Sequence, residues 1–146
     1  MGTTYEQDIV AWANEQAQLL RAGRLSELDI RHIAEEIEDV GKSEQRELSS
    51  RMAVLLAHLL KWEFQPERRG AWELTIRTQR KSIERRMQRT PSLKSSLADP
   101  EWLADAWDDA LTEASKETGL AVFPESCPWP LDRILDRQFF PGGNPP

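Results

Sequence analysis

The amino-acid sequence predicts an all-α protein: a four-to-five-helix bundle with one long central helix and a proline-rich C-terminal clasp. Apolar residues recur every three or four positions over most of the chain, which is the spacing of one face of an α-helix. No stretch alternates apolar and polar residues as a half-buried strand does. We therefore expect a single helical domain over residues 4–141 and a frayed tail over residues 142–146.

The first helix is predicted to begin after Thr4, which can cap a helix with Gln7 as its capping-box partner. Gly23 is the expected C-terminal stop, because glycine readily adopts the left-handed conformation that ends helices. Between them, helical spacing relates six residues: Tyr5, Ile9, Trp12, Gln16, Leu19 and Leu20.

The central helix is predicted to run from Asp29, as its cap, to about Trp62. Gly41 interrupts it at a cost of about 1 kcal/mol relative to alanine, and a bend there is left open. The stretch from Met52 to Leu60 is apolar on nearly every side, so it is the predicted centre of the core. One period relates nine positions along this helix: Ile30, Ile33, Ile37, Val40, Glu44, Leu48, Met52, Leu55 and Leu59.

Prolines and glycines delimit the remaining elements. A third helix is predicted over residues 71–89, followed by a turn or short helix after Pro91. The dipeptide Asp99-Pro100 is a helix start signal, and Gly119 is the stop of that fourth helix. A short helix is expected over residues 131–136, and residues 139–141 form the predicted apolar clasp.

Length and composition exclude several classes of protein. The chain has 146 residues, of which 39% are hydrophobic and 30% charged, as in a soluble single-domain protein. Its longest apolar stretch is about nine residues, whereas a membrane-spanning helix needs about 20. The first residues do not resemble a secretory signal, and Cys127, the only cysteine, cannot form an internal disulfide. We therefore expect a cytoplasmic protein.

The charge is unevenly distributed along the sequence. Net charge is −5 over residues 1–60, +6 over residues 61–94 and −7 over residues 95–146. The favoured interpretation is that a basic middle segment packs between acidic flanks. The alternative is a polyanion-binding face on the third helix, formed by Arg77, Arg80, Lys81 and Arg85 within the basic stretch 68–89. The acidic net charge argues against nucleic acid as the partner.

A candidate polar site combines His58 with carboxylates. His58 lies inside the most apolar stretch of the chain, where an imidazole needs hydrogen-bond partners, and it is either a satisfied core residue or a ligand or base. Glu35 and Glu36 lie on the acidic part of the same helix, and Trp72 completes the candidate set. In a continuous helix Glu36 and His58 are about 33 Å apart, so they could meet only in an antiparallel dimer.

Known catalytic and metal motifs are absent from the sequence. It has no Glu-x-x-His pair of the ferritin type and no His-Glu-x-x-His. It also has no phosphate loop, dinucleotide fingerprint or nucleophile elbow. We expect no cofactor and no bound metal.

Motifs spread over the whole chain resemble one bacterial family. Their order and spacing are similar to those of the family catalogued as domain of unknown function 29, over about residues 4–141. The resemblance implies an all-helical fold and supplies no catalytic residues. The motifs that carry it are Asp8, Trp12, Gln16, Leu20-Arg21, Glu35-Glu36-Ile37-Glu38, Gly41, Ser43-Glu44, His58-Leu59-Leu60-Lys61-Trp62, Gln65-Pro66, Trp72, Thr75-Ile76, Gln79-Arg80, Pro91-Ser92-Leu93, Glu117-Thr118, Phe123-Pro124, Cys127-Pro128 and Phe139-Phe140-Pro141.

Taken together, these features favour a non-catalytic interaction or regulatory module with a homodimer or an unidentified protein as its partner and no membrane association. Two alternatives stay open. One is a metal-dependent or hydrolytic enzyme using His58 and helix carboxylates, and the other is a polyanion binder that uses the arginine stripe.

Overall fold

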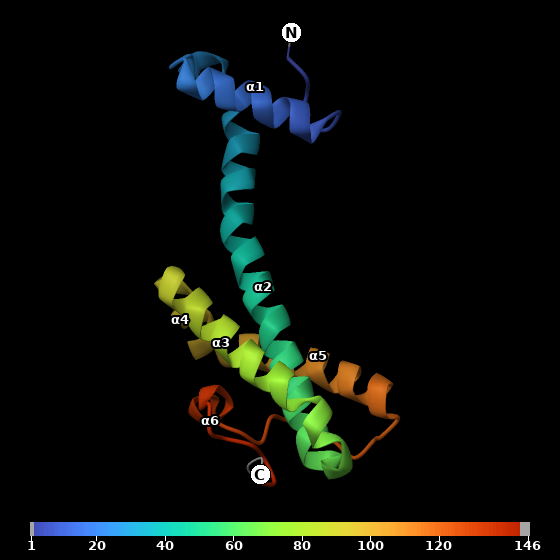
Figure 1. Cartoon of the computed structure of the whole chain (residues 1–146). Helices are drawn as coiled ribbons and strands as arrows, with labels where there is room; N and C mark the ends of the chain where they lie inside the picture. Colours follow the sequence, from blue (N-terminus) through green and yellow to red (C-terminus); the bar gives the residue numbers. More distant parts are fainter. Residues whose placement is uncertain (1, 144–146) are drawn as a thin grey trace. The chain divides into compact units, whose positions relative to one another are not determined.

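A computed structural model describes residues 2–143, and every regular element in that range is helical. The chain divides into two compact units, Met1–Glu44 and Gln45–Pro146, here called the N-terminal and C-terminal units. Figure 1 shows α1 and the start of α2 in the first unit, and the rest of α2 with α3 to α6 in the second. The all-helical prediction is confirmed, whereas a single domain over residues 4–141 stays a prediction.

Helix α1 (Ile9–Arg21) begins later than the sequence analysis expected. Its cap is Asp8, whose Oδ1 accepts hydrogen bonds of 3.1 Å from the backbone N–H groups of Val10 and Ala11. Thr4 instead closes a turn before the helix, because its carbonyl accepts from the N–H groups of Gln7 and Asp8. The predicted stop at Gly23 is confirmed by its positive φ of 72°, and the short 3₁₀-helix η1 (Leu25–Glu27) follows.

Helix α2 (Ile30–Phe64) has 35 residues and continues through Gly41. Its first turn is capped as predicted, since Asp29 Oδ1 accepts from the backbone N–H of His32 at 3.4 Å. The helical apolar spacing therefore outweighs the propensity cost of one glycine.

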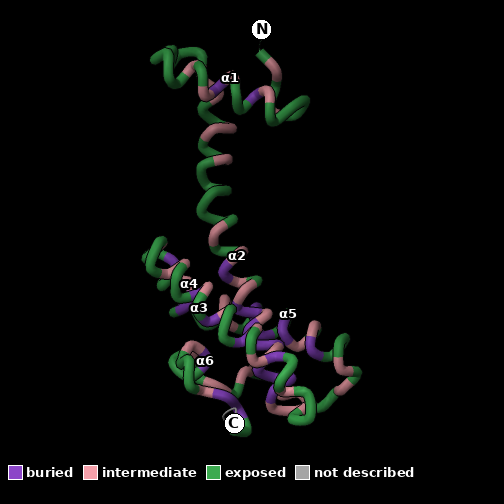
Figure 2. Tube along the Cα trace, in the orientation of Figure 1, coloured by how far each residue is buried: buried purple, intermediate pink, exposed green. Residues whose placement is uncertain are grey.

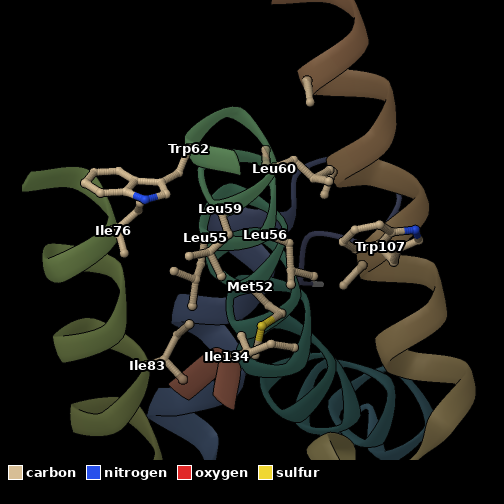
Figure 3. Close-up of a cluster of buried hydrophobic side chains, with 14 of the residues drawn as sticks. Met52, Leu55, Leu56, Leu59, Leu60, Trp62, Ile76, Ile83, Trp107 and Ile134 are labelled. Carbon is tan, nitrogen blue, oxygen red and sulfur yellow. The ribbon is translucent and has the colours of Figure 1, made fainter. Parts of the chain in front are cut away.

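The second half of α2 forms the centre of the C-terminal unit. Figure 3 shows Ile76 and Ile83 of α3 on one side of it and Trp107 of α5 on the other, with Ile134 of α6 nearby. All the residues of α2 from Met52 to Leu60 except Val54 and His58 are buried, as predicted. Seven residues of α2 with no measurable exposure anchor this core: Leu48, Met52, Leu55, Leu56, Ala57, Leu59 and Leu60.

Five helices follow α2 before the C-terminal segment: η2 (Pro66–Ala71), α3 (Glu73–Arg89), the short pair η3 (Pro91–Leu93) and α4 (Lys94–Ala98), and α5 (Pro100–Thr118). The predicted boundaries of α5 are confirmed. Asp99 caps it by accepting from Glu101 N–H at 3.0 Å, and Gly119 ends it in the left-handed conformation with φ of 70°.

The proline-rich segment after α5 returns to the core around α6 (Leu131–Leu135). The Trp107 indole N–H donates to the carbonyl of Glu125 at 3.0 Å. Farther on, the Phe140 ring lies 4.6 Å from the Trp62 ring, and the Trp62 indole N–H donates to the Gly143 carbonyl at 3.1 Å. The predicted frayed tail begins at Gly142, yet the Gly143 carbonyl accepts this hydrogen bond from a core residue. Residues 144–146 of the predicted tail lie outside the described range.

None of the helices within residues 2–143 is both long and apolar enough to cross a membrane.

Candidate interaction site

Asp29 joins the two helices of the N-terminal unit through one carboxylate oxygen. Its Oδ2 accepts from the indole N–H of Trp12 at 2.9 Å and lies 2.7 Å from Nδ1 of His32. Its backbone N–H donates to Oε1 of Gln16 at 2.8 Å. Trp12 and Gln16 are the only buried residues in the described part of this unit, so the network replaces a hydrophobic core there.

Three aromatic rings pack around this carboxylate. The Tyr5 ring stacks on the His32 ring with centroids 4.2 Å apart and an interplanar angle of 9°. It meets Trp12 edge-on at 4.9 Å. Its hydroxyl donates to Glu36, and this hydrogen bond is the main reason that the pKa of Tyr5 is raised to about 12. The segment before α1 is thereby held against the first turns of α2.

His32 lies between two carboxylates that favour its protonated form. Its hydrogen bond to Asp29 raises the pKa of His32 above the ordinary histidine value and lowers the pKa of Asp29. On its other side, Nε2 lies 3.2 Å from Oε1 of Glu6. The protonated ring therefore bridges two carboxylates.

A cleft of about 790 Å³ borders this network. Its lining includes Tyr5, Trp12, Glu15, Asp29 and His32. These polar groups already pair within the unit: Glu15, for example, accepts from the Thr3 backbone N–H at 2.9 and 3.1 Å. Chemically, the arrangement ties the N-terminal segment to α1 and α2 through hydrogen bonds and ring contacts.

Exposed apolar side chains are concentrated in the same unit. In the described part of the chain, nine large hydrophobic residues are exposed, and seven of them precede residue 45. Figure 2 shows the long exposed stretches of α1 and of the first turns of α2. We call these seven residues the N-terminal apolar surface: Ile9, Val10, Leu20, Leu25, Ile30, Ile37 and Val40.

The predicted polar site is divided between the two units. Glu35 and Glu36 belong to the N-terminal unit, where Glu36 pairs with Tyr5 and Glu35 lies 3.8 Å from Arg31. His58 and Trp72 belong to the C-terminal unit. Each of these residues makes its observed contacts within its own unit.

His58 is half-buried and bonded to its own helix. Its Nδ1 lies 2.8 Å from the Val54 carbonyl, to which it donates in the neutral form, and burial lowers the pKa of His58. Nearby, Lys61 is 2% exposed and forms an ion pair with Glu117, which lowers the pKa of that carboxyl. The Lys61 ammonium also lies 5.6 Å from the centre of the Trp72 ring.

One of the four residues of the predicted basic face, Arg80, is buried in the core. Arg77, Lys81 and Arg85 are exposed, but Arg80 is only 2% exposed. Arg80 Nε donates to the Ile134 carbonyl at 2.8 Å, and burial lowers the pKa of Arg80 to about 10. Arg80 is therefore a packing residue between α3 and α6, and the sequence interpretation of it as a surface residue is wrong.

No group of three or more His, Cys, Asp or Glu residues within residues 2–143 is arranged to hold a metal ion. Cys127 is half-buried, its thiol lies 3.4 Å from the Trp129 carbonyl, and burial raises its pKa.

Sequence reasoning identified the members of the Asp29 network only in part. Tyr5, Trp12 and Gln16 were assigned to one helical stripe, and Asp29 to a cap. The available signal was the Asp29-to-His32 spacing, which brings a cap residue and a side chain of the first turn together. Their pairing with Trp12 depends on how α1 packs on α2, which spacing along the chain does not encode.

Comparison with curated proteins finds no match. A crystal structure of an α-helical protein of unknown function from Rhodospirillum rubrum is similar to this chain, with 29% sequence identity and a TM-score of 0.62. The alignment covers 95% of this chain and 93% of that one. The family described as domain of unknown function DUF29 matches residues 4–140. The match spans nearly the whole sequence, and the chain therefore belongs to this family.

Proposed function

We propose that the protein is a non-catalytic interaction module that binds another protein through its N-terminal apolar surface. The concentration of exposed hydrophobic residues in one unit supports this, because seven of the nine lie there among the described residues. On a soluble protein, exposed apolar residues that gather on one surface mark an interaction site. Of its residues that the structure describes, the same unit buries only Trp12 and Gln16, so it gains little stability from a core of its own.

Charge favours a different protein over a second copy as the occupant. Residues 1–44 hold ten acidic and four basic side chains, a net charge of −6, whereas residues 45–146 are balanced. Two copies meeting through this unit would repel each other, and a basic partner would be attracted. The homodimer considered from the sequence is the competing outcome of the test below.

In this proposal the C-terminal unit is the supporting part of the molecule, a helical bundle closed by the proline-rich clasp. The contact of Phe140 with Trp62 and the Arg80 hydrogen bond to Ile134 support this assignment. Its role is to anchor the second half of α2.

Site-specific photo-crosslinking in cells tests the proposal. A photo-reactive residue replaces Ile37, which is 67% exposed, and in a control replaces Leu74, which is 75% exposed in the other unit. We expect a heterologous adduct at position 37 that the purified partner re-forms in vitro, and none at position 74. Equal adducts at both positions, or none at either, would overturn the proposal.

Light scattering after gel filtration checks for self-association. A dimer dissociated by Ile37→Ser would make the second copy the occupant.

A further inference from the structure

We infer that the partner contributes a basic amphipathic helix, which packs along the Ile30-to-Gly41 stretch of α2. This inference rests on the proposed function and names the chemistry of its partner. The argument comes from how the same helix is covered elsewhere in this chain.

The chain itself covers the second half of α2 with a helix of that kind. Helix α3 holds six basic and two acidic residues. Its Ile76 and Ile83 are fully buried in one cluster with Leu55 and Leu59 of α2. At the edge of this contact, Arg86 of α3 lies 3.4 Å from Glu47 of α2. The apolar stripe of α3 therefore packs on the apolar stripe of α2. Beside this contact, an arginine of α3 faces a glutamate of α2.

The apolar period of α2 does not stop where this cover ends. Positions 30, 37 and 41 fall within about 60° of positions 48, 52, 55 and 59 around the helix axis, at 100° per residue. In the later part these positions hold side chains with no measurable exposure, such as Leu48 and Leu55. In the earlier part, Ile30 is 69% and Ile37 67% exposed. The first half of α2 thus offers the kind of surface that α3 covers in the second half.

The uncovered stretch is shaped and charged for a helix. Ala34 and Gly41 lie on the same side of α2 as Ile30 and Ile37, and a Cβ added at Gly41 would meet no atom within 4 Å. Small residues on a helix face let a second helix approach closely. The exposed carboxylate of Glu38 borders the stretch, whereas Glu35 and Asp39 lie farther round the helix and add to its negative charge. A partner helix with lysine or arginine beside its apolar stripe would pair with Glu38, as Arg86 pairs with Glu47.

Fluorescence anisotropy with labelled synthetic peptides tests this inference on the full chain. The probe is a peptide of residues 72–90 of this protein, which carries the basic amphipathic pattern. The control peptide keeps the apolar residues and replaces every Lys and Arg with Glu. We expect the basic peptide to bind at least about tenfold more tightly than the acidic one, and added salt to weaken its binding.

Protein variants locate the binding. Ile37→Ser should weaken binding of the basic peptide about tenfold or more, and Leu74→Ser, matched in exposure, should leave it unchanged. Far-UV circular dichroism confirms that both variants keep their helix content. Equal binding of the two peptides, equal effects of the two substitutions or no binding would overturn the inference. If the crosslink at position 37 still forms a heterologous adduct, the proposed function stands and only the partner chemistry is wrong.

Discussion

At the scale of single residues, the two histidines of this chain have opposite electrostatic environments. His32 lies against two carboxylates, Asp29 and Glu6, which favour its charged form. His58 is half-buried on α2, and desolvation favours its neutral form. The residue type alone therefore does not tell whether a histidine is charged or neutral. The neighbouring carboxylates of His32 and the burial of His58 determine which form each one favours.

We predict that the two imidazoles titrate on opposite sides of the usual histidine pKa, His32 above it and His58 below it. A histidine with a raised folded-state pKa stabilises the folded protein at pH values below its unfolded pKa. This stabilisation is lost as the pH rises through the folded pKa. NMR titration of the two side chains measures both values. In Asp29→Asn, the pKa of His32 should return toward its ordinary value, and coincident titration of both rings in the native protein would contradict the prediction.

The ion pair between Lys61 and Glu117 is asymmetric in burial. Lys61 is 2% exposed, whereas the Glu117 side chain is 49% exposed. We predict that Glu117→Ala lowers the free energy of unfolding by about 2 kcal/mol, because it leaves a buried ammonium unpaired. Lys61→Met should change it by less, because Glu117 can then be hydrated. Urea denaturation measures both variants, and a larger loss for Lys61→Met than for Glu117→Ala would refute this account.

At the scale of elements, two helical glycines differ in backbone conformation. Gly41 has helical geometry inside α2, whereas Gly119 ends α5 with φ of 70°. We predict that Gly41→Ala stabilises the protein by about 1 kcal/mol and that Gly119→Ala destabilises it by about the same amount. Thermal unfolding measures both changes. A destabilised Gly41→Ala would show that α2 needs glycine at this position.

Element boundaries were predictable where a local signal and the apolar period agreed. Asp99, Pro100 and Gly119 delimit α5 as the sequence indicates, because capping and left-handed geometry are local properties. The start of α1 was misplaced because Thr4 and Asp8 are both competent caps and the sequence does not rank them. Arg80 was assigned to a surface from its residue type, although it lies four residues after Ile76 and three before Ile83, on the buried face.

At the scale of the whole molecule, the two units differ in what holds them together. The C-terminal unit has a continuous cluster of buried side chains centred on α2. The N-terminal unit has hydrogen bonds and stacked rings around Asp29 and little buried apolar area. The spacing of apolar residues in the sequence predicted the buried cluster of the C-terminal unit but not the Asp29 network of the N-terminal unit. Hydrophobic periodicity indicates which residues form a core, and it does not indicate which polar side chains form hydrogen bonds with one another.

We predict that backbone amides of α1 and of α2 before Glu44 exchange with deuterium much faster than those from Leu48 to Leu60. Protection against exchange follows the free energy of local opening, which is low where few apolar contacts are lost. Hydrogen-exchange mass spectrometry with peptides on both sides of Glu44 makes the comparison. Uniform protection along α2 would show that the helix opens as one cooperative segment.

Trp12 gives the N-terminal unit an optical label of its own. The chain has six tryptophans, and the other five follow residue 60. The Trp12 ring lies 6.3 Å from His32, edge-on, with its indole N–H bonded to Asp29. A protonated imidazole so close to an indole quenches its emission, so the difference spectrum between the native protein and Trp12→Phe should brighten as His32 loses its proton. The fluorescence of Trp12 therefore reports the protonation of His32, and so of the N-terminal unit alone. The measurement needs no isotope labelling and uses micromolar protein.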